Sequence, residues 1–573
     1  MLLLFLIADL GSATAPYQAS DGFVFDGDTS AYAGSFFDSY ACASDKPEAG
    51  PEIVFELSLS EESDLDLIVE TSTAAIDVDV HLLGSLAKSG TRAADCLARA
   101  DKNVTVFHLA AGKYFIVADT YGASAAKAGA FRLYARVYPS ARVTWTDVAR
   151  GVRWGRGSFN EAGGFSVLNL LDVDATQGAR VELVDNGACK KLGAVNLPAR
   201  AVAATNAGFF TGSCAPDGLL RVSGTTIEAA KGSQHAIGLQ ADGSATYEKP
   251  AAGSAFTQAP SAVGSFGYFD LRSATPLIDE DGTTFGRVRH PRTVIHSAPL
   301  RLGLFTLDGR SDAGLGATFT HLQSVLAGVG AKQGLNLDGG GSSAMWVKGE
   351  PMGGIVNYPS DSTTVVHGGV RAVRSLAVVF ADAIVRPPFF VTLPERRTLH
   401  DGEVLRYAAR AVAPGGEAVS YALRSPPPKA GWSAGELVFA PDGAQNGVHA
   451  LALEACAAQA CTVQVVSVTV AMTPVVAPSG ATGGVSGTTG ASGVAGEAGT
   501  EVTPSLTEQA APQGDPPAPE VRRGCAGCQS SLMHDPAMPI ALLLLGFLRG
   551  RSKSRASRLH DRYGDDERPR APA

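Results

Sequence analysis

The amino-acid sequence predicts a multidomain protein: an α+β domain with a mixed sheet, flanked by two all-β sandwich domains. The chain has 573 residues, and single domains typically hold roughly 100–200 residues. Apolar and polar residues alternate before residue 140 and after residue 387, as half-buried strands require. Only the middle region adds a helical repeat of apolar residues to such strands.

The first fifteen residues, "MLLLFLIADLGSATA", predict export. A short apolar run precedes Ala13-Thr14-Ala15, which fits an A-x-A cleavage site. The run is too short to span a bilayer, and the usual basic residues are missing from its start. A buried N-terminal strand is the alternative, but the cleavage pattern favours a signal peptide over residues 1–15 and an exported protein.

Residues 16–140 contain strand-like runs such as "EIVFELSLS" and "AIDVDVHLL". "DVDVHLL" and the later "HLAAGKYFIVADTYG" resemble the bacterial pre-peptidase C-terminal domain, a secreted β-sandwich module. Asp77 and Asp79 are potential metal ligands. Alternation favours the simpler interpretation that both face solvent.

Residues 387–471 return to strand-like alternation and resemble the immunoglobulin-like or cadherin-like modules of bacterial surface proteins. Residues 472–520 consist mainly of Gly, Ala, Ser, Thr, Pro and Val, which cannot bury a core and predict a flexible linker. In residues 521–573, "RRGCAGC", "MPIALLLLGFL" and "RGRSKSR" resemble a myxobacterial C-terminal sorting tag. A transmembrane anchor is the alternative, and both interpretations predict attachment to the cell envelope.

The eight cysteines fall into local pairs, as expected for disulfides in an exported protein. None of the pairs lies among enough His or Cys for a zinc site. We expect a disulfide within the middle domain in particular, because Cys189 and Cys214 are each other's only nearby partner. The four pairs are Cys42 and Cys96, Cys189 and Cys214, Cys456 and Cys461, and Cys525 and Cys528.

Within residues 141–383, the strand "RLGLFTLDGR" ends at Asp308, and the strand "GLNLD" ends at Asp338. Between them, "TFTHLQSVLAGVGAKQ" predicts a helix with Phe319, Leu322, Val325, Leu326 and Val329 on one face and a capping box of Thr320 and Gln323. If the helix is a crossover, the two strands are parallel neighbours or near neighbours. Both aspartates then lie at the same sheet edge, where such sheets bind ligands.

The segment "DGGGSS" that begins at Asp338 offers a carboxylate, three glycines and hydroxyl groups. Free amides of Gly339, Gly340 and Gly341, with Ser342 beside them, would suit an anion. The segment lacks the Lys-Ser or Lys-Thr that ends a nucleotide-binding P-loop. A tight turn between two strands remains an alternative.

"NLDGGGSSAM" at residues 336–345 is very similar to the signature of the phosphodiester glycosidase family. Further matches follow the family's order: "TNAGFF" (205–210), "RTVIH" (292–296), "TLDGR" (306–310), "NYPSD" (357–361) and "RAV" (371–373). Ala207, His296 and Val370 depart from the family pattern.

The resemblance implies cleavage of a sugar C1–O bond with a phosphate ester as leaving group. Asp338 would be base or nucleophile, and Asp308 a second carboxylate or a ligand of sugar hydroxyls. Arg292 and Arg371, with the amides of residues 339–341, would stabilise the departing anion. The implied substrate-binding residues are Asn206, Thr293, Gly339, Gly340, Gly341, Ser342, Asn357 and Arg371.

No cofactor is required for this reaction, although two neighbouring carboxylates could also bind a hard divalent cation. His290, His296 and His367 are expected to be ordinary polar residues. A net charge of -9 gives no basic footprint for nucleic acid. The expected partners are a glycan or sugar-phosphodiester substrate and, through the C-terminal segment, the cell envelope.

Two other functions compete with an exported glycosidase. One is a catalytically inactive carbohydrate-binding or adhesion protein on the cell surface. Flanking β-sandwich domains are consistent with such a protein as well as with an enzyme. The other is a secreted protease, which no Gly-x-Ser-x-Gly or His-Glu-x-x-His motif supports.

Overall fold

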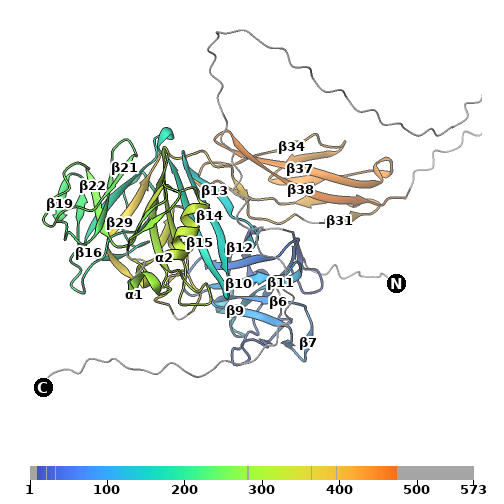
Figure 1. The fold of residues 1–573 in the computed structure, drawn as a ribbon. Coiled ribbons are helices and arrows are strands. Elements are labelled where there is room, and N and C mark those ends of the chain that lie inside the picture. Colours follow the sequence, from blue (N-terminus) through green and yellow to red (C-terminus); the bar gives the residue numbers. More distant parts are fainter. Residues whose placement is uncertain are drawn as a thin grey trace, which may run out of the picture. The chain divides into compact units, whose positions relative to one another are not determined.

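The computed structural model describes residues 10–473, apart from residues 21, 33, 280–282, 363 and 395. The described part is mostly β-structure in several sheets, with only two α-helices (Figure 1). Neither helix has the length and apolar character needed to cross a membrane. Most of the predicted signal peptide, the linker and the C-terminal segment lie outside the described residues, so their assignments remain predictions.

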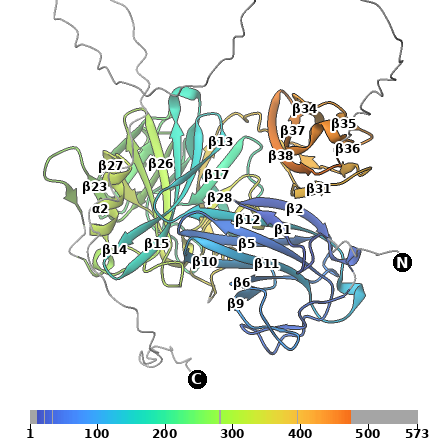
Figure 2. The same cartoon turned by 90° about the vertical axis from the view of Figure 1, so that its right-hand side faces the viewer.

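The N-terminal region is a sandwich of two sheets, as its alternation predicts (Figure 2). Phe55, Val80 and Ile116 of the first sheet pack against Leu67 and Leu133 of the second. The first sheet has the order β1 (Tyr17–Ala19), β4 (Glu52–Leu59), β11 (Gly112–Thr120), β6 (Val78–Leu83), β9 (Cys96–Ala100). The second has the order β10 (Asn103–Leu109), β5 (Ser63–Thr71), β12 (Ala130–Pro139), β2 (Phe23–Asp28).

The outer face of the first sheet is also covered, by a segment around residues 36–48. This segment contains β3 (Ser39–Tyr40), which pairs with β8 (Arg92–Ala93); β8 in turn pairs with β7 (Lys88–Ser89). Phe37 and Tyr40 pack there against Val117 of β11. Asp79 is therefore only 1% exposed. Its expected solvent-facing position is wrong, because alternation along a strand cannot show that another segment covers the outer face.

The central region contains three sheets in which every pairing is antiparallel. The expected mixed sheet is thus wrong, and an α+β class is not confirmed, since α1 (Thr284–Arg287) is a single turn and only α2 (Phe319–Gly328) is longer. The largest sheet has the order β13 (Thr144–Ala149), β14 (Val152–Glu161), β15 (Gly164–Asp174), β26 (Arg301–Leu307), β25 (Arg292–Ala298), β27 (Gln333–Asn336), β23 (Tyr268–Asp270), β24 (Leu277–Ile278).

The two smaller central sheets complete this region. One has the order β16 (Arg180–Lys191), β29 (Ala372–Phe380), β17 (Ala201–Asn206), β28 (Met345–Val347). The other has the order β19 (Thr225–Glu228), β18 (Leu220–Val222), β22 (Ser261–Ser265), β20 (His235–Leu239), β21 (Ala245–Glu248).

The strands β26 and β27 run in the same direction, as expected for two strands joined by a helix. They are not hydrogen-bonded neighbours, because β25 lies between them and is antiparallel to both. The prediction of parallel near neighbours is therefore confirmed. The sheet remains antiparallel because β25, from earlier in the chain, occupies the position between them.

Two apolar layers hold the largest sheet. On one face, Leu304 and Ile295 pack against Val181, Ala203 and Val379 of the β16–β29–β17–β28 sheet. On the other face, the apolar side of α2 packs against the sheet, with Phe319, Leu322, Val325 and Leu326 buried. The cap of α2 differs from the prediction: the capping box is formed by Thr318 and His321, so the helix begins at Phe319.

The region after residue 387 also has two main sheets around one core, in which Leu405 and Phe439 pack with Leu453 and Val466. The first sheet has the order β31 (Arg396–Leu399), β38 (Ala460–Val470), β37 (Gly447–Ala457), β34 (Ser420–Arg424). The second has the order β32 (Leu405–Tyr407), β36 (Glu436–Phe439), β35 (Ala430–Ser433), and β30 (Phe389–Phe390) pairs separately with β33 (Ala411–Val412).

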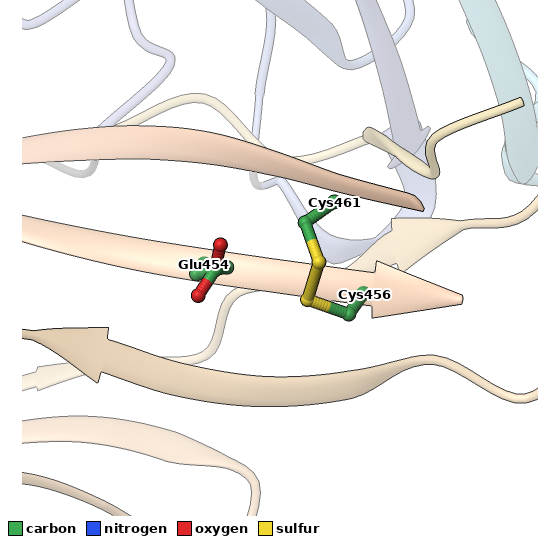
Figure 3. Close-up of side chains that lie close together, drawn as sticks. All are labelled: Glu454, Cys456 and Cys461. Carbon is green, nitrogen blue, oxygen red and sulfur yellow. A yellow bond between two sulfur atoms is a disulfide. The ribbon is translucent and has the colours of Figure 1, made fainter. Parts of the chain in front are cut away.

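Three of the predicted cysteine pairs form disulfides: Cys42–Cys96, Cys189–Cys214 and Cys456–Cys461. The last joins the ends of β37 and β38 (Figure 3). Glu454 lies near these two sulfur atoms, but because they are bonded to each other they are not free to bind a metal. Cys525 and Cys528 lie outside the described residues.

Candidate active site

The loop that follows β27 carries Asp338, a half-buried carboxylate. Its backbone amide donates to the carbonyl oxygen of Ala207 at 2.9 Å, which fixes the loop against the end of β17. Burial raises the pKa of Asp338 from 3.8 to about 6, although the Ser342 hydroxyl, the Gly339 amide and Arg371 act in the opposite direction. A carboxyl group that changes charge near neutral pH suits a general base or nucleophile.

The three glycines after Asp338 each allow a close approach that a side chain would block. A Cβ atom on Gly339 would lie 2.7 Å from the carbonyl oxygen of Pro291. Gly340 has a φ of +62° and lies under the guanidinium of Arg310. A Cβ atom on Gly341 would overlap the side chains of Asp361 and Arg371. The glycine run therefore lets charged groups from other loops lie directly on this backbone.

The predicted row of free amides is interrupted at Gly340. The Gly340 amide donates to the carbonyl oxygen of Pro291 at 2.8 Å. The amides of Ser342 and Ser343 donate to the carbonyl oxygens of Gly339 and Gly340, because the chain forms a short 3-10 helix over Gly340–Ser342. The loop joins β27 to β28, which belong to different sheets, so it is also not a turn within one hairpin.

Two arginines supply positive charge around the loop. Arg310 is exposed, and its Nη2 lies 2.5 Å from Nδ1 of His290. Burial and the charges of Arg310 and Arg292 lower the pKa of His290 to about 4, so this ring is neutral at neutral pH. Arg371 is bidentate to Asp361, with N–O distances of 2.7 and 2.6 Å. No carboxylate pairs with Arg310 among the residues that the structure describes, which leaves it suited to an anionic ligand.

Arg292 and Thr293 are adjacent on β25 and point to opposite faces of the sheet. Arg292 is buried between the rings of Phe285 and Phe319 and donates to three backbone carbonyls. Burial and the nearby Arg310 lower its pKa to about 10, and within the described residues its Nη1 lacks a partner. Arg292 thus braces the loops beside the site rather than being held out towards solvent.

Asn206, at the end of β17, joins the two facing sheets. Its side-chain oxygen accepts from the Thr293 hydroxyl at 2.7 Å and from the Ala344 amide at 3.2 Å. Its side-chain nitrogen donates to the carbonyl oxygen of Asp338 at 2.6 Å. Asn206 and Thr293 therefore fix the backbone on both sides of the glycine run, which makes them positioning residues.

Asp308 lies deeper than Asp338 and is only 1% exposed. One carboxylate oxygen accepts from the side-chain nitrogen of Asn357 at 2.9 Å, and the other from the backbone amide of Tyr358 at 3.1 Å. Burial raises its pKa to about 6, while these two donors, Arg156 and His367 lower it. The side-chain oxygen of Asn357 also accepts from the Met345 amide at 2.8 Å. Asp308 and Asn357 together therefore anchor the chain that follows the glycine run.

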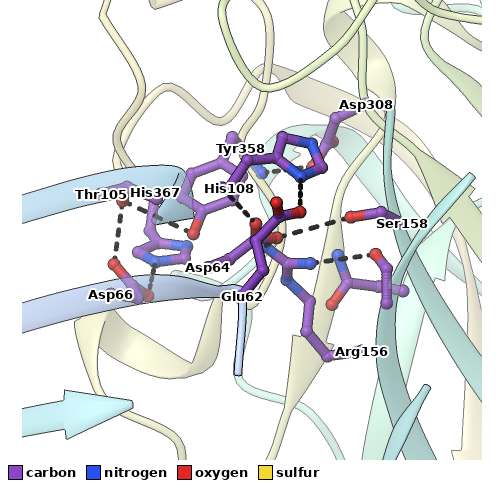
Figure 4. A network of polar contacts seen from close by, with 12 residues as sticks. Glu62, Asp64, Asp66, Thr105, His108, Arg156, Ser158, Asp308, Tyr358 and His367 are labelled. Carbon is purple, nitrogen blue, oxygen red and sulfur yellow. Dashed lines mark hydrogen bonds and ion pairs between the residues drawn. The ribbon is translucent and has the colours of Figure 1, made fainter. Parts of the chain in front are cut away.

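A polar network continues from Asp308 and Tyr358 towards the N-terminal sandwich (Figure 4). Nδ1 of His367 lies 2.9 Å from the carbonyl oxygen of Asn357, and its Nε2 lies 3.0 Å from Asp66 of β5. Arg156 of β14 contacts Asp64 at 3.3 Å. The backbone beneath the candidate site is therefore linked to residues outside the central region.

The structure brings Asp338, Gly339, Gly340, Gly341, Ser342 and Arg371 together and places Arg292, Thr293, Asn206, Asn357 and Asp308 around and beneath them. The sequence-based residue set omitted Arg310, Asp361 and His290. Arg310 and Asp361 end the segments "TLDGR" and "NYPSD", so a signal for them was present. His290 precedes the "RTVIH" segment, and only its spatial contact with Arg310 distinguishes it.

Comparisons with known proteins find one family over the part of the chain that holds this site. Residues 199–380 match the phosphodiester glycosidase family. The match covers β17 to β29 and includes the glycine loop and both arginines beside it. The strands β13 to β16 precede it, although they complete the same sheets. No curated protein matches the chain.

The solved structures that are similar at low sequence identity include the following two. The catalytic domain of zebrafish N-acetylglucosamine-1-phosphodiester alpha-N-acetylglucosaminidase, auto-inhibited by its pro-peptide, is 16% identical with a TM-score of 0.34. The match covers 42% of this chain and 86% of that chain. A hypothetical protein from Synechocystis is 14% identical with a TM-score of 0.38, covering 63% of this chain and 81% of that chain.

Proposed function

We propose that the central region hydrolyses the glycosidic bond of sugar 1-phosphodiesters, or of closely related linkages, in envelope or extracellular glycans. The observation that carries this proposal is the half-buried Asp338, whose pKa is about 6, on a glycine loop contacted by Arg310 and Arg371. The family match over residues 199–380 supports the same reaction class.

The proposed reaction forms a bond from oxygen to the anomeric carbon and breaks the bond from that carbon to the phosphate oxygen, which leaves with the electron pair. Asp338 either takes a proton from the attacking water or attacks the carbon itself. In the second case, water then hydrolyses the glycosyl ester on Asp338, which releases the sugar and regenerates the carboxylate. A phosphate ester is a stable anion, so the leaving group needs less protonation than an alcohol does. Charge stabilisation of the departing phosphate is then the main requirement.

Arg310 is our candidate for that stabilisation, in place of Arg292. It is exposed, it lies over Gly340, and it contacts a neutral histidine rather than a carboxylate. Arg371 is held by Asp361 and lowers the pKa of Asp338, so it keeps the carboxylate charged near neutral pH. We assign a positioning role to four further residues, because their side chains make hydrogen bonds within the protein. They are Asp308, Asn357, Asn206 and Thr293.

A panel of sugar 1-phosphodiesters, with the matching sugar 1-phosphomonoesters and alkyl glycosides, tests this proposal on the purified full chain. Release of the free sugar from a phosphodiester, with and without chelator, is the expected result. Cleavage of alkyl glycosides alone would contradict it, because the leaving group would then need a proton that this site is not built to give.

A catalytically inactive carbohydrate-binding protein is the second candidate, since sandwiches flank the site and Arg310 and Arg371 could bind an anionic sugar without cleaving it. Calorimetry with the same panel separates the two functions. Binding without turnover, unchanged by Asp338→Asn, would favour the inactive protein.

Export and retention at the envelope remain part of the proposal, on the strength of the "MLLLFLIADLGSATA" start and the "RRGCAGC" to "RGRSKSR" end. Cell fractionation should find the full chain outside the cytoplasm, and deletion of residues 521–573 should release it to the medium. Recovery from the cytosol would contradict this assignment.

A further inference from the structure

A second group of polar residues lies far from the glycine loop, on the covered outer face of the first N-terminal sheet. Glu48 comes from the covering segment, His81 from β6 and Asp119 from β11, and each is 0% exposed. One potential ligand atom from each of the three lies within 4.8 Å of the other two. Ligands of a single metal ion about 2.0–2.2 Å away would be at most roughly 4.4 Å apart, so small side-chain shifts suffice.

Four polar atoms of these three residues have no hydrogen-bond partner outside the acidic group among the described residues. They are Oε2 of Glu48, Oδ1 of Asp119 and both ring nitrogens of His81. Oδ1 of Asp79, which is also buried, has no partner outside the group either, and the carboxyl groups of Asp79 and Glu48 interact with each other. Buried polar atoms normally have a partner, and a buried imidazole with two unpartnered nitrogens needs a specific explanation.

The remaining oxygens of the same carboxylates are held firmly. The Tyr40 hydroxyl donates to Oδ2 of Asp119 at 2.6 Å, and Arg99 donates to Oε1 of Glu48 at 3.0 Å. Arg99 also pairs with Oδ2 of Asp79. The His81 ring stacks on Tyr40 with centroids 3.5 Å apart, which fixes its plane. Each group is thus oriented by at least one contact and keeps at least one atom for a ligand, as outer contacts orient the ligands of a metal.

This group of residues also contains more carboxyl groups than cations. Glu48, Asp79 and Asp119 are buried around one cation, Arg99, and Glu52 is a fourth buried carboxylate nearby that accepts from the amide of Phe36. Burial raises the pKa of Glu48, Glu52 and Asp119, so without a further cation these carboxyl groups tend to keep their protons. A divalent cation among the free atoms would replace those protons and bind the carboxylates.

We propose that Glu48, His81 and Asp119 bind a divalent transition-metal cation of the Zn²⁺ or Mn²⁺ type, with Asp79 as an adjacent further carboxylate. The imidazole nitrogen favours such a metal over Mg²⁺ or Ca²⁺, which prefer oxygen ligands alone. The ion would join the covering segment to β6 and β11, beside the Cys42–Cys96 disulfide. This is a structural role, independent of the chemistry proposed at Asp338.

The first test uses the purified full chain without substitutions. We expect about one equivalent of Zn²⁺ or Mn²⁺ by elemental analysis, a melting temperature that falls by several degrees on chelation, and recovery when either metal is added back. Hydrogen exchange should show that the added metal protects the amides of residues 36–48. A chain that holds neither metal, and whose melting temperature and exchange do not respond to them, would overturn the proposal.

Variants then locate the ion. His81→Gln and Glu48→Gln should each lose the bound metal. Asp101→Asn is the matched control, because Asp101 pairs with the same Arg99 but its side chain is 71% exposed. Asp338→Asn controls for a metal at the glycine loop, and both controls should keep the ion. Metal retained by His81→Gln would overturn the assignment; if the variants do not fold, the exchange pattern of the unsubstituted chain decides.

Discussion

His367 Nε2 of the central region lies 3.0 Å from Asp66 Oδ2 of the N-terminal sandwich, with each side chain only 4% exposed. Burial alone would raise the pKa of Asp66, but His367 and the hydrogen bonds from Thr105 and Asn103 hold it below its usual value. The other nitrogen of His367 contacts the carbonyl of Asn357. The two regions thus share a buried polar contact. It reaches Asn357, whose side chain donates a hydrogen bond to Asp308.

Replacing either partner of this contact should destabilise the protein. Asp66→Asn and His367→Gln each leave a buried polar group with a poorer partner, a loss of roughly 1–3 kcal/mol. Denaturant unfolding of both single variants and of the double variant measures the coupling free energy between them. Strictly additive effects would show that the contact contributes nothing specific.

Asp338→Asn should remove most of the activity while the fold persists. The amide has nearly the shape of the carboxylate, and Asp338 is half-buried at a loop rather than part of the core. Asp308→Asn is the matched comparison: its carboxylate accepts from two donors, so the variant should lose melting temperature more than Asp338→Asn does. Full activity per folded molecule in Asp338→Asn would assign the chemistry to another group.

The dependence on pH should report the Asp338 carboxyl group. Because its pKa is about 6, kcat/KM should rise as the pH increases through about 6, where the carboxyl loses its proton. Stability should respond in the opposite sense. The folded carboxyl keeps its proton to a higher pH than the unfolded value of 3.8, so its contribution to stability is present below that value and is lost as the pH rises through about 6.

Asp338→Asn checks both pH effects. Without the titrating group, the variant should lose less unfolding free energy than the unsubstituted chain when the pH rises from about 4 to about 7. Parallel melting curves over this range give the comparison. An identical pH dependence of stability in the two proteins would contradict the raised pKa.

Arg310→Ala should lower kcat strongly and leave the melting temperature nearly unchanged. Arg310 is exposed and pairs with no carboxylate within the described part of the chain. Loss of one donor to a developing negative charge typically costs about 10²–10³ in kcat. The effect should be largest for phosphate leaving groups of high pKa. Arg292→Ala should instead lower the melting temperature, since its guanidinium donates to three backbone carbonyls.

Gly341→Ala should disturb the site through sterics alone. The added methyl group would overlap the paired side chains of Asp361 and Arg371, so activity should fall as that pair moves away from Asp338. Gly368→Ala is the matched control: it lies in a nearby loop, and nothing is within 4 Å of its added Cβ. Equal activity in the two variants would mean that the Asp361–Arg371 pair does not contribute.

The sequence by itself determined the two-sheet regions, three disulfide pairs, the strand–helix–strand unit that leads to two aspartates, and the ordered family motifs between residues 205 and 373. These follow from local patterns: alternation reports a half-buried strand, and an ordered set of short motifs reports a family. Most of the candidate site was found for the same reason, because its residues lie within those motifs.

Only the tertiary structure decided which of the motif residues can reach a ligand. Asp308 and Asp338 both follow a strand. The carboxylate of Asp308 accepts hydrogen bonds from Asn357 and Tyr358 and is buried, whereas Asp338 is only half-buried. Neighbouring Arg292 and Thr293 point to opposite faces of β25. Asp79 is covered by a segment some forty residues earlier in the chain. Side-chain roles depend on contacts between segments far apart in sequence, and local patterns carry no information about those contacts.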